Sequence, residues 1–432
     1  MASCWRSLWQ AVAFRASVTL LYDAWVPGLV CHKLCAAEHY QNLFNEYDQA
    51  MRPFKETVLT AESPVLFDTL TTRSGHKIGV LTLNAPKAMN AVDLTMVNLI
   101  DKQLKRWEKS DKLVAVLMRG AGDKAFCAGG DIRQLYDSMQ AEGEDHCRYA
   151  DNFFSGEYGK NYRVHLFSKP LIAWGNGFVM GGGLGLFIGA NHRVGTETLK
   201  LAWPEVRIGL FPDVAASWYL SRLPYPAGHW MGLSGSHMNA VDCKDLKLTH
   251  YCLTHAQQDE MLAQLRQQDW SDNQAANHHT VRALLHALET PVVESMPASQ
   301  LQPVQAELDE LFACDDLSKI AARFAQHRSE NVWLQQGLDN FKAGCPATAH
   351  LIMEQLHRGK QMSLKEVVQW ELVLAYQSVR HPDFAEGIRA MVVDKDFKPR
   401  WQHAHVDDVP ASWIEALMYS PWPQDKHPLA HI

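Results

Sequence analysis

A glycine-rich segment in the middle of the chain constrains its fold more than any other feature. It runs Gly175-Asn-Gly-Phe-Val-Met-Gly-Gly-Gly183, and it follows an apolar run from Pro170 to Trp174 that is typical of a buried strand. An apolar helix is expected next, from about Gly182 to Gly189. Glycines at a helix entrance let a ligand approach the backbone, and free N–H groups there stabilise negative charge. The segment therefore predicts an anion-binding turn between strand and helix, or else a tight turn packed against a sheet.

Strands and helices alternate before this segment. The apolar runs Ile78 to Leu83 and Leu113 to Met118 are predicted as strands that are buried on both faces. Between them, a helix that begins near Asp93 carries one apolar stripe at helical spacing. This order predicts an α/β architecture. After about Cys252 the pattern becomes helical, so we expect a core domain over residues 64–252 and a mainly helical region over residues 253–432.

The same glycines partly imitate a dinucleotide-binding fingerprint. Gly175, Gly177 and Gly181 follow a strand, and Glu197 stands where an acid could bind a ribose. That fingerprint normally opens the first strand-helix-strand unit, whereas predicted strands precede this segment. A dinucleotide site is therefore the weaker interpretation, and no cofactor is expected.

Composition places the chain among ordinary globular proteins. Of its 432 residues, 47% are hydrophobic and 21% are charged, which is enough to bury a core in one large or two moderate domains. The net charge of -7 argues against binding nucleic acid through a strongly basic surface. The cysteines show no paired CxxC spacing, which indicates reduced thiols. Cys31, His32, Cys35 and His39 fit no tetrahedral zinc pattern, so no metal site is expected.

Residues 1 to about 50 form an extension before the first predicted strand. Up to about His39 the extension is poor in acidic residues and carries Arg6, Arg15 and Lys33, as transit peptides do. Its apolar stretches are too short to span a membrane. The other interpretation, an extension upstream of a natural start at Met51, is slightly favoured and predicts a cytoplasmic protein. A transit peptide would instead direct the protein to the mitochondrial matrix.

A second exposed turn follows the second predicted strand. Ala125-Phe-Cys-Ala-Gly-Gly-Asp131 offers another backbone N–H, and two such donors that converge on one point would form an oxyanion hole. Together with Leu83-Asn-Ala-Pro-Lys-Ala-Met-Asn-Ala91 and Met180-Gly-Gly-Gly183, this segment resembles the crotonase superfamily in order and spacing. The resemblance implies a ClpP/crotonase-like spiral of ββα units that binds an acyl-CoA. It also implies that the N–H groups of Ala128 and Gly182 hold the thioester oxygen.

Acidic residues distinguish the branches of this superfamily. Hydratases resemble one another in carrying a glutamate two residues after the glycine triplet, where this chain has Gly185. Trp203-Pro-Glu205 and Ile208-Gly-Leu-Phe-Pro-Asp213 resemble the 3-hydroxyisobutyryl-CoA hydrolase branch instead. The C-terminal segment from His381 to Ala390 resembles that branch as well.

The resemblance makes three carboxylates candidate site residues. It implies that Glu205 attacks the thioester carbon or activates water, and that Asp213 contacts a substrate 3-hydroxyl or assists proton transfer. Glu157 would hold the polar network of the pocket. An isolated carboxylate is ordinarily a solvated surface charge. The motif context makes a role in the site the favoured interpretation for Glu205 and Asp213. For Glu157 it leaves a role in the site and a solvated surface charge equally favoured.

Other positions depart from the family pattern or are expected to bind the rest of the ligand. Ala215-Ala216 replace a glycine pair, which is expected to narrow the acyl pocket, and Lys247 replaces a glycine in a surface turn. Lys87 and Arg133 flank the motif loops and are candidate partners of the CoA phosphates. The superfamily resemblance also favours a homotrimer or a homohexamer.

The resemblance implies an enzyme that hydrolyses a short-chain 3-hydroxyacyl-CoA, most directly 3-hydroxyisobutyryl-CoA in valine catabolism. The only cofactor-like group would be the CoA of the substrate. An enoyl-CoA isomerase or hydratase that uses Glu205 is one alternative. A non-catalytic acyl-CoA-binding protein is another, although it would not need both Glu205 and Asp213. Release of free thiol from an acyl-CoA separates these functions.

Overall fold

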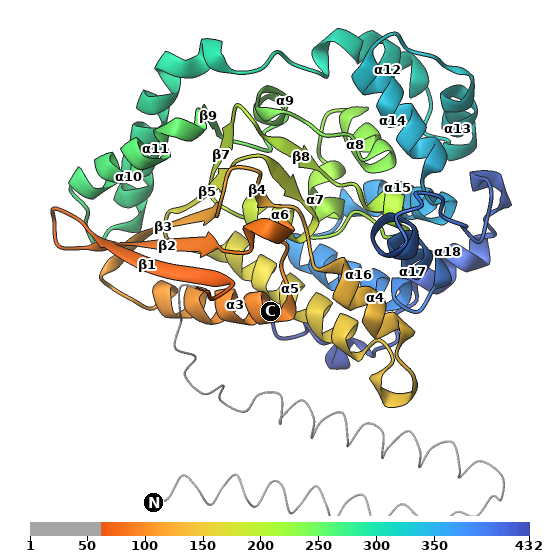
Figure 1. Cartoon of the computed structure of the whole chain (residues 1–432), viewed down its shortest axis with the longest axis horizontal. Coiled ribbons are helices and arrows are strands. Elements are labelled where there is room, and N and C mark those ends of the chain that lie inside the picture. Colours follow the sequence, from red (N-terminus) through yellow and green to blue (C-terminus); the bar gives the residue numbers. More distant parts are fainter. Residues whose placement is uncertain (1–61) are drawn as a thin grey trace, which may run out of the picture. The chain divides into compact units, whose positions relative to one another are not determined.

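The computed structural model describes residues 62–432, apart from the side chains of Glu144 and Val293 (Figure 1). The N-terminal extension lies outside the described residues. The Cys31 and Cys35 positions and the alternative start at Met51 lie outside them as well.

The larger of two sheets has six strands in the order β1-β2-β3-β5-β7-β9. β1 pairs antiparallel with β2, and every later neighbour pairs in parallel. The strands are β1 (Val65–Thr71), β2 (Lys77–Leu83), β3 (Leu113–Gly120), β5 (Leu171–Gly175), β7 (His192–Thr196) and β9 (Tyr251–Leu253). The strands predicted at residues 78–83, 113–118 and 170–174 are confirmed as β2, β3 and β5.

The smaller sheet has three parallel strands, β4 (Ala125–Cys127), β6 (Phe178–Met180) and β8 (Lys200–Ala202). Along the chain β4 follows β3, β6 follows β5, and β8 follows β7, so each turn of the chain adds one strand to each sheet. Helices connect these turns: α3 (Leu94–Glu108), α4 (Ile132–Gln140), α5 (Arg148–Leu166) and α6 (Gly181–Ile188). The predicted spiral of ββα units is therefore confirmed.

Helix α3 shows how local sequence sets an element of this spiral. The Asp93 carboxylate caps its start and accepts the Met96 N–H at 2.7 Å, which satisfies one of the donors that a helix N-terminus leaves free. Its predicted apolar stripe is buried, with the buried positions at Val97, Ile100, Leu104 and Trp107.

After β9 the described chain is helical, as the sequence predicts. Short helices α7 (Ala216–Leu220), α8 (Ala227–Ser234) and α9 (Ala240–Asp245) precede β9. The later helices are α10 (Gln258–Gln267), α11 (Gln274–Glu289), α12 (Gln305–Leu311), α13 (Leu317–Gln326), α14 (Val332–Ala343), α15 (Pro346–Gly359), α16 (Leu364–Ser378), α17 (Pro382–Ile388) and α18 (Ala411–Met418).

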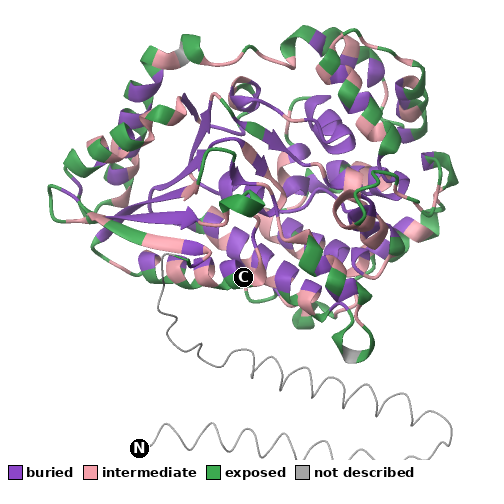
Figure 2. Ribbon diagram, viewed as in Figure 1, coloured by how far each residue is buried: buried purple, intermediate pink, exposed green. Residues whose placement is uncertain are grey.

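Two hydrophobic clusters hold these elements together. The larger one contains residues of α3 and α5 together with residues of α12 to α18, so the C-terminal helices complete the core of the spiral. The smaller cluster joins α10 and α11 to the large sheet through residues such as Ile172, Trp174 and Leu285. Figure 2 shows most strands buried, whereas β1 at the edge of the large sheet is mainly intermediate or exposed.

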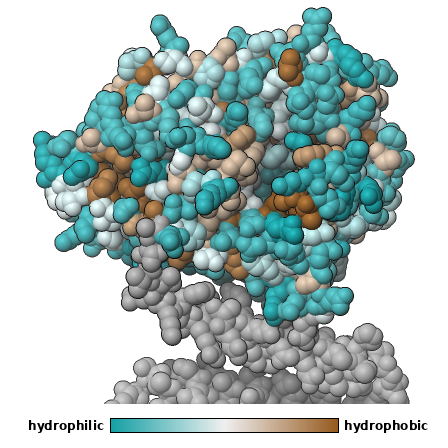
Figure 3. All heavy atoms as spheres, in the orientation of Figure 1, coloured by the Kyte–Doolittle hydropathy of each residue, from teal (hydrophilic) through white to brown (hydrophobic). Residues whose placement is uncertain are grey.

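Figure 3 shows a mainly hydrophilic face on which apolar residues gather in a few patches. Within residues 62–432, no helix has both the length and the apolar character needed to cross a bilayer.

Candidate active site

A cavity of about 600 Å³ lies where the strands of the small sheet end. The turns after β4, β6 and β8 line it together with α5 and with residues of the C-terminal helical region. Five predicted site residues also line it: Ala128, Glu157, Gly182, Glu205 and Asp213. The structure thus brings together groups that come from separate turns of the spiral.

The backbone donors of this cavity differ from the predicted pair. Gly182 lies in the first turn of α6, where N–H groups have no intrahelical acceptor. The Ala128 N–H is not free, because it donates to the Met89 carbonyl at 3.0 Å. Gly130 N lies 3.5 Å from the position that a Cβ on Gly182 would occupy, and its N–H has no acceptor among the described residues. The prediction of Ala128 is therefore corrected to Gly130, because Ala128 is held in the turn by Met89.

The absence of a side chain at Gly182 lets a carboxylate approach these donors. A Cβ at this position would lie only 2.2 Å from Oε1 of Glu157. Glu157 comes from α5 and is 1% exposed, so its carboxylate is fixed beside the helix entrance. Any residue larger than glycine at position 182 would displace that carboxylate.

Glu205 begins the 3-10 helix Glu205–Ile208 directly after β8 and Pro204. The residue is 4% exposed, and its Oε2 atom has no hydrogen-bond partner among the described residues. Burial, together with the negative charge of Glu371, raises the pKa of Glu205 to about 8. A carboxyl group with this pKa can exchange a proton near neutral pH.

Asp213 lies in the loop that follows this 3-10 helix. Its Oδ2 atom accepts a hydrogen bond from the Tyr158 hydroxyl at 3.0 Å. Burial raises the pKa of Asp213, and the charges of Glu205, Glu157 and Glu371 raise it further. The tyrosine therefore orients one oxygen of a carboxyl group whose ionisation is coupled to that of its acidic neighbours.

A buried lysine compensates part of this negative charge. Lys160 lies one helical turn after Glu157, and its Nζ has no hydrogen-bond partner among the described residues. Burial raises the pKa of Glu157 to about 7, whereas the Lys160 ammonium lowers it. Burial also lowers the pKa of Lys160 itself. The two groups therefore form an acid-base pair behind the oxyanion-binding turn.

A sequence comparison identifies the family to which the chain belongs. The enoyl-CoA hydratase/isomerase family model matches residues 78–418. The chain belongs to the enoyl-CoA hydratase/isomerase, or crotonase, family. The predicted resemblance to that superfamily is thereby confirmed.

Individual relatives within this family carry different names. The mitochondrial 3-hydroxyisobutyryl-CoA hydrolase of Danio rerio is 33% identical over 361 residues, which cover 83% of this chain and 90% of the relative. The small ribosomal subunit protein mS47 of Neurospora crassa is 29% identical over 80% of this chain and 69% of the relative. The crystal structure of a carnitinyl-CoA dehydratase from Mycobacterium thermoresistibile is 30% identical and has a TM-score of 0.73, with 85% of this chain and 99% of that chain covered.

Gly185 occupies the position of the hydratase glutamate that this chain lacks, and its surroundings leave no room for a larger side chain. A Cβ at this position would lie 2.3 Å from Nδ2 of Asn161 and 2.8 Å from Cβ of Val214. Asn161 and the Asp213 loop therefore fill the space that a glutamate side chain at position 185 would require. The acidic residues that line the cavity are Glu157, Glu205 and Asp213.

The loop that carries Asp213 is held by a carboxylate from the C-terminal helices. Glu371 on α16 is fully buried and accepts the N–H groups of Ala215 at 2.7 Å and Ser217 at 2.9 Å. Val214 and Ala215 have φ values of 54° and 73°, which lie in the left-handed region that favours glycine. Of the two positions at which the family usually has glycine, Ala215 has this conformation, whereas Ala216 begins helix α7. Ala215 and Ala216 do not line the cavity, so the predicted narrowing of the acyl pocket is wrong.

The predicted cations for the CoA phosphates lie outside the cavity lining. Lys87 is in the 3-10 helix Pro86–Ala88, and Arg133 at the start of α4 pairs with Asp137 at 3.4 Å. Arg207 does line the cavity and is half-buried. Arg207 is therefore better placed than Lys87 and Arg133 to contact a ligand phosphate. Its position two residues after Glu205 was the sequence feature that could have indicated this.

Sequence reasoning also missed Tyr158, Lys160 and Glu371. Lys160 lies three residues after the candidate Glu157 on one helix, so helical spacing could have found it, whereas Tyr158 is adjacent to Glu157 in the chain and is identified only by its contact with Asp213. Glu371 interrupts the apolar run Val367 to Ala375, and a single acid on a buried helix face is a recognisable signal. Its partner loop lies far away in the sequence, and only the folded chain identifies it.

Proposed function

We propose that this protein hydrolyses a short-chain 3-hydroxyacyl-CoA thioester, and that 3-hydroxyisobutyryl-CoA is its preferred substrate. The observation that carries the proposal is the shared enclosure of Glu205 and Asp213 with two backbone donors. The obstructed space at Gly185 argues against hydration that needs a second acid there. The name of the Danio rerio relative supports the choice of acyl group.

The reaction begins at the thioester carbonyl. Its oxygen accepts the N–H groups of Gly182 and Gly130, which stabilise the negative charge that develops as the carbon is attacked. Removal of one such donor in a comparable enzyme costs on the order of 3 kcal/mol. The Glu205 carboxylate attacks the carbon, the carbon–sulfur bond breaks, and the sulfur takes a proton as CoA leaves. Water then cleaves the resulting anhydride and regenerates Glu205.

A second route uses Glu205 as a general base. In that route Glu205 takes a proton from water as the water oxygen attacks the same carbon, and no anhydride forms. The carbon–sulfur bond then breaks, and the proton on Glu205 passes to the leaving sulfur. Both routes need the ionised form of Glu205. Its raised pKa of about 8 means that activity should increase with pH toward that value.

The remaining groups recognise the substrate. Asp213, oriented by Tyr158, binds the 3-hydroxyl of the acyl chain, and Arg207 binds a phosphate of CoA. No metal or nucleotide participates in the proposed reaction. We propose that the protein resides in the mitochondrion rather than in the cytoplasm, because the hydrolases of Danio rerio and Homo sapiens to which it is similar are named as mitochondrial proteins.

The name of another relative suggests a different function. The Neurospora crassa protein is named as a ribosomal subunit protein, so a family member can serve in an assembly. A non-catalytic role for this chain would keep acyl-CoA binding without thiol release. An isomerase or hydratase role would change the acyl group and leave the thioester intact.

The test measures two reactions on the purified protein. Free thiol is followed with 3-hydroxyisobutyryl-CoA, and hydration is followed with crotonyl-CoA. The proposal expects steady thiol release without added metal and negligible hydration. Efficient hydration without thiol release would support the hydratase alternative, and binding without either reaction would support the non-catalytic one.

A further inference from the structure

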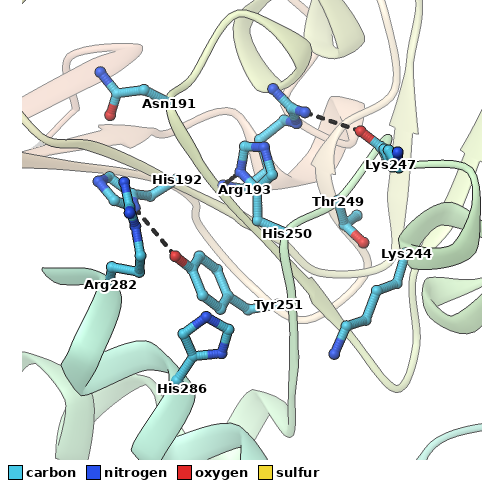
Figure 4. A pocket seen from close by; sticks show the side chains of 10 residues that line it. All are labelled: Asn191, His192, Arg193, Lys244, Lys247, Thr249, His250, Tyr251, Arg282 and His286. Carbon is cyan, nitrogen blue, oxygen red and sulfur yellow. Dashed lines mark hydrogen bonds between the residues drawn. The ribbon is translucent and has the colours of Figure 1, made fainter. Parts of the chain in front are cut away.

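A second cavity, of about 530 Å³, shares no lining residue with the candidate active site. It is built from the start of β7, the segment between α9 and β9, and one face of α11 (Figure 4). Its lining residues are Asn191, His192, Arg193, Lys244, Lys247, Thr249, His250, Tyr251, Arg282 and His286. None of these ten residues is acidic, and most carry a cation or an imidazole.

The positive charge of this pocket is only partly neutralised. Lys244 forms an ion pair with Glu289 at 2.5 Å. The exposed side chains of Lys247 and Arg282 have no carboxylate within ion-pair distance among the described residues. Figure 4 shows Lys244 and Lys247 on one side of the pocket and Arg282 on the other.

A buried arginine adds to this charge. The Arg193 guanidinium donates to backbone carbonyls, which include those of Lys247, Leu248 and Ile188. No carboxylate among the described residues balances it. Arginine retains its charge when buried, so these contacts fix a permanent cation behind the pocket.

A buried hydroxyl at the same place lacks a partner. Thr249 is 2% exposed, and its Oγ1 has no hydrogen-bond partner among the described residues. Buried polar groups are nearly always hydrogen-bonded, and an unpaired one costs stability. Thr249 lines the pocket, so a bound acceptor atom would satisfy its hydroxyl.

Burial and this uncompensated positive charge lower the pKa values of two imidazoles in the pocket. Burial, together with the charges of Arg193 and Arg282, lowers the pKa of His250 to about 3. Burial likewise lowers the pKa of His192 to about 3, with His278, His250 and both arginines contributing. Both rings are therefore neutral in the empty pocket, and a bound anion would favour their protonation.

We propose that this pocket binds the phosphate group of a small molecule. Lysine and arginine cations, a buried hydroxyl and the Nε2–H group of His250, whose Nδ1 atom accepts the Arg193 N–H, together match the oxygens of a phosphate. The volume of about 530 Å³ would hold a ligand as large as a nucleotide. The phosphate could belong to a nucleotide or be inorganic, and separate arms of the test distinguish these sources.

Calorimetric titration of the full chain with pyrophosphate, orthophosphate and ADP tests the site. The key variant is Lys247→Asn/Arg282→Gln, because asparagine tolerates the left-handed backbone at Lys247. Its matched control, Lys102→Gln/Arg106→Gln, removes the same charges from exposed positions on α3. We expect pyrophosphate to bind the unchanged protein and the control alike, and the pocket variant at least about 10-fold more weakly. Tighter binding of ADP than of pyrophosphate would identify a nucleotide as the source.

A second variant tests whether pyrophosphate binds in this pocket or is attracted only by the overall positive charge nearby. Thr249→Val keeps the shape of the side chain and removes the unpaired hydroxyl, so the protein should fold normally and bind pyrophosphate about 5-fold more weakly. Arg207→Gln in the candidate active site should leave pyrophosphate binding unchanged. Failure of the unchanged protein to bind at millimolar concentration, or an equal loss in the α3 control, would overturn the proposal. Loss of binding in Arg207→Gln alone would assign the phosphate to the active site instead.

Discussion

At the scale of single residues, the site depends on which polar groups the fold leaves unpaired. Glu205 keeps one oxygen without a partner, and Asp213 has one oxygen oriented by Tyr158. Motif spacing in the sequence predicted that both acids share the cavity. It misassigned the donor Ala128, because the contact of Ala128 with Met89 depends on how two distant turns fold together.

Replacement of Asp213 by asparagine tests its role in substrate recognition. The variant keeps the shape but loses the carboxylate, so turnover of 3-hydroxyisobutyryl-CoA should fall at least about 10-fold more than that of isobutyryl-CoA. Tyr158→Phe should produce the same selective loss to a smaller extent, because Asp213 remains present. Equal losses on both substrates in the Asp213 variant would indicate a direct part in the chemistry.

At the scale of elements, strands and helices followed from local patterns and the connections between distant elements did not. β2, β3, β5 and α3 lie where apolar runs, helical spacing and a capping aspartate predicted them. The support of the Asp213 loop by α16 was not predictable in this way. This support consists of hydrogen bonds that the Ala215 and Ser217 N–H groups donate to Glu371, which lies 156 and 154 residues away in the sequence.

Glu371→Gln tests whether α16 positions that loop. The Ala215 and Ser217 N–H groups are accepted by different oxygens of Glu371, and glutamine replaces one of these oxygens by an NH2 donor. One of the two hydrogen bonds is therefore lost, and the left-handed turn at Ala215 loses part of its support. We expect kcat for 3-hydroxyisobutyryl-CoA to fall about 10-fold, with a smaller loss for isobutyryl-CoA. Glu366→Gln on the same helix is the control, because glutamine can still complete the capping box with Ser363. A lower melting temperature with an unchanged substrate ratio would limit Glu371 to a structural role.

At the scale of the whole molecule, folding encloses several carboxyl groups in one region. Burial raises the pKa of Glu205 to about 8 and those of Glu157 and Glu371 to about 7. These groups bind protons in the folded state that they lose in the unfolded state, so their contribution to stability is lost as pH rises toward 8. The family fold could be predicted from the sequence, but this concentration of acids arises from three separate elements that meet only in the folded chain.

The free energy of unfolding should therefore decrease between about pH 6.5 and pH 8. The histidines whose pKa values are lowered by burial oppose this effect only near pH 6.5, where their imidazoles are still partly protonated in the unfolded chain, and they are neutral in both states toward pH 8. Chemical denaturation at several pH values measures the slope, and Glu157→Gln/Glu205→Gln should flatten it. A stability that stays constant or rises over this range would contradict the burial of ionisable acids in the folded protein.

The central claim is that Glu205 carries the chemistry of thioester hydrolysis. Its most direct test compares thiol release from 3-hydroxyisobutyryl-CoA by the unchanged protein, by Glu205→Gln and by Glu415→Gln, which alters an exposed carboxylate on α18. The account predicts that Glu205→Gln loses about 100-fold or more in kcat with little change in substrate binding, whereas Glu415→Gln retains full activity. A folded Glu205→Gln protein that releases thiol at the unchanged rate would contradict the claim.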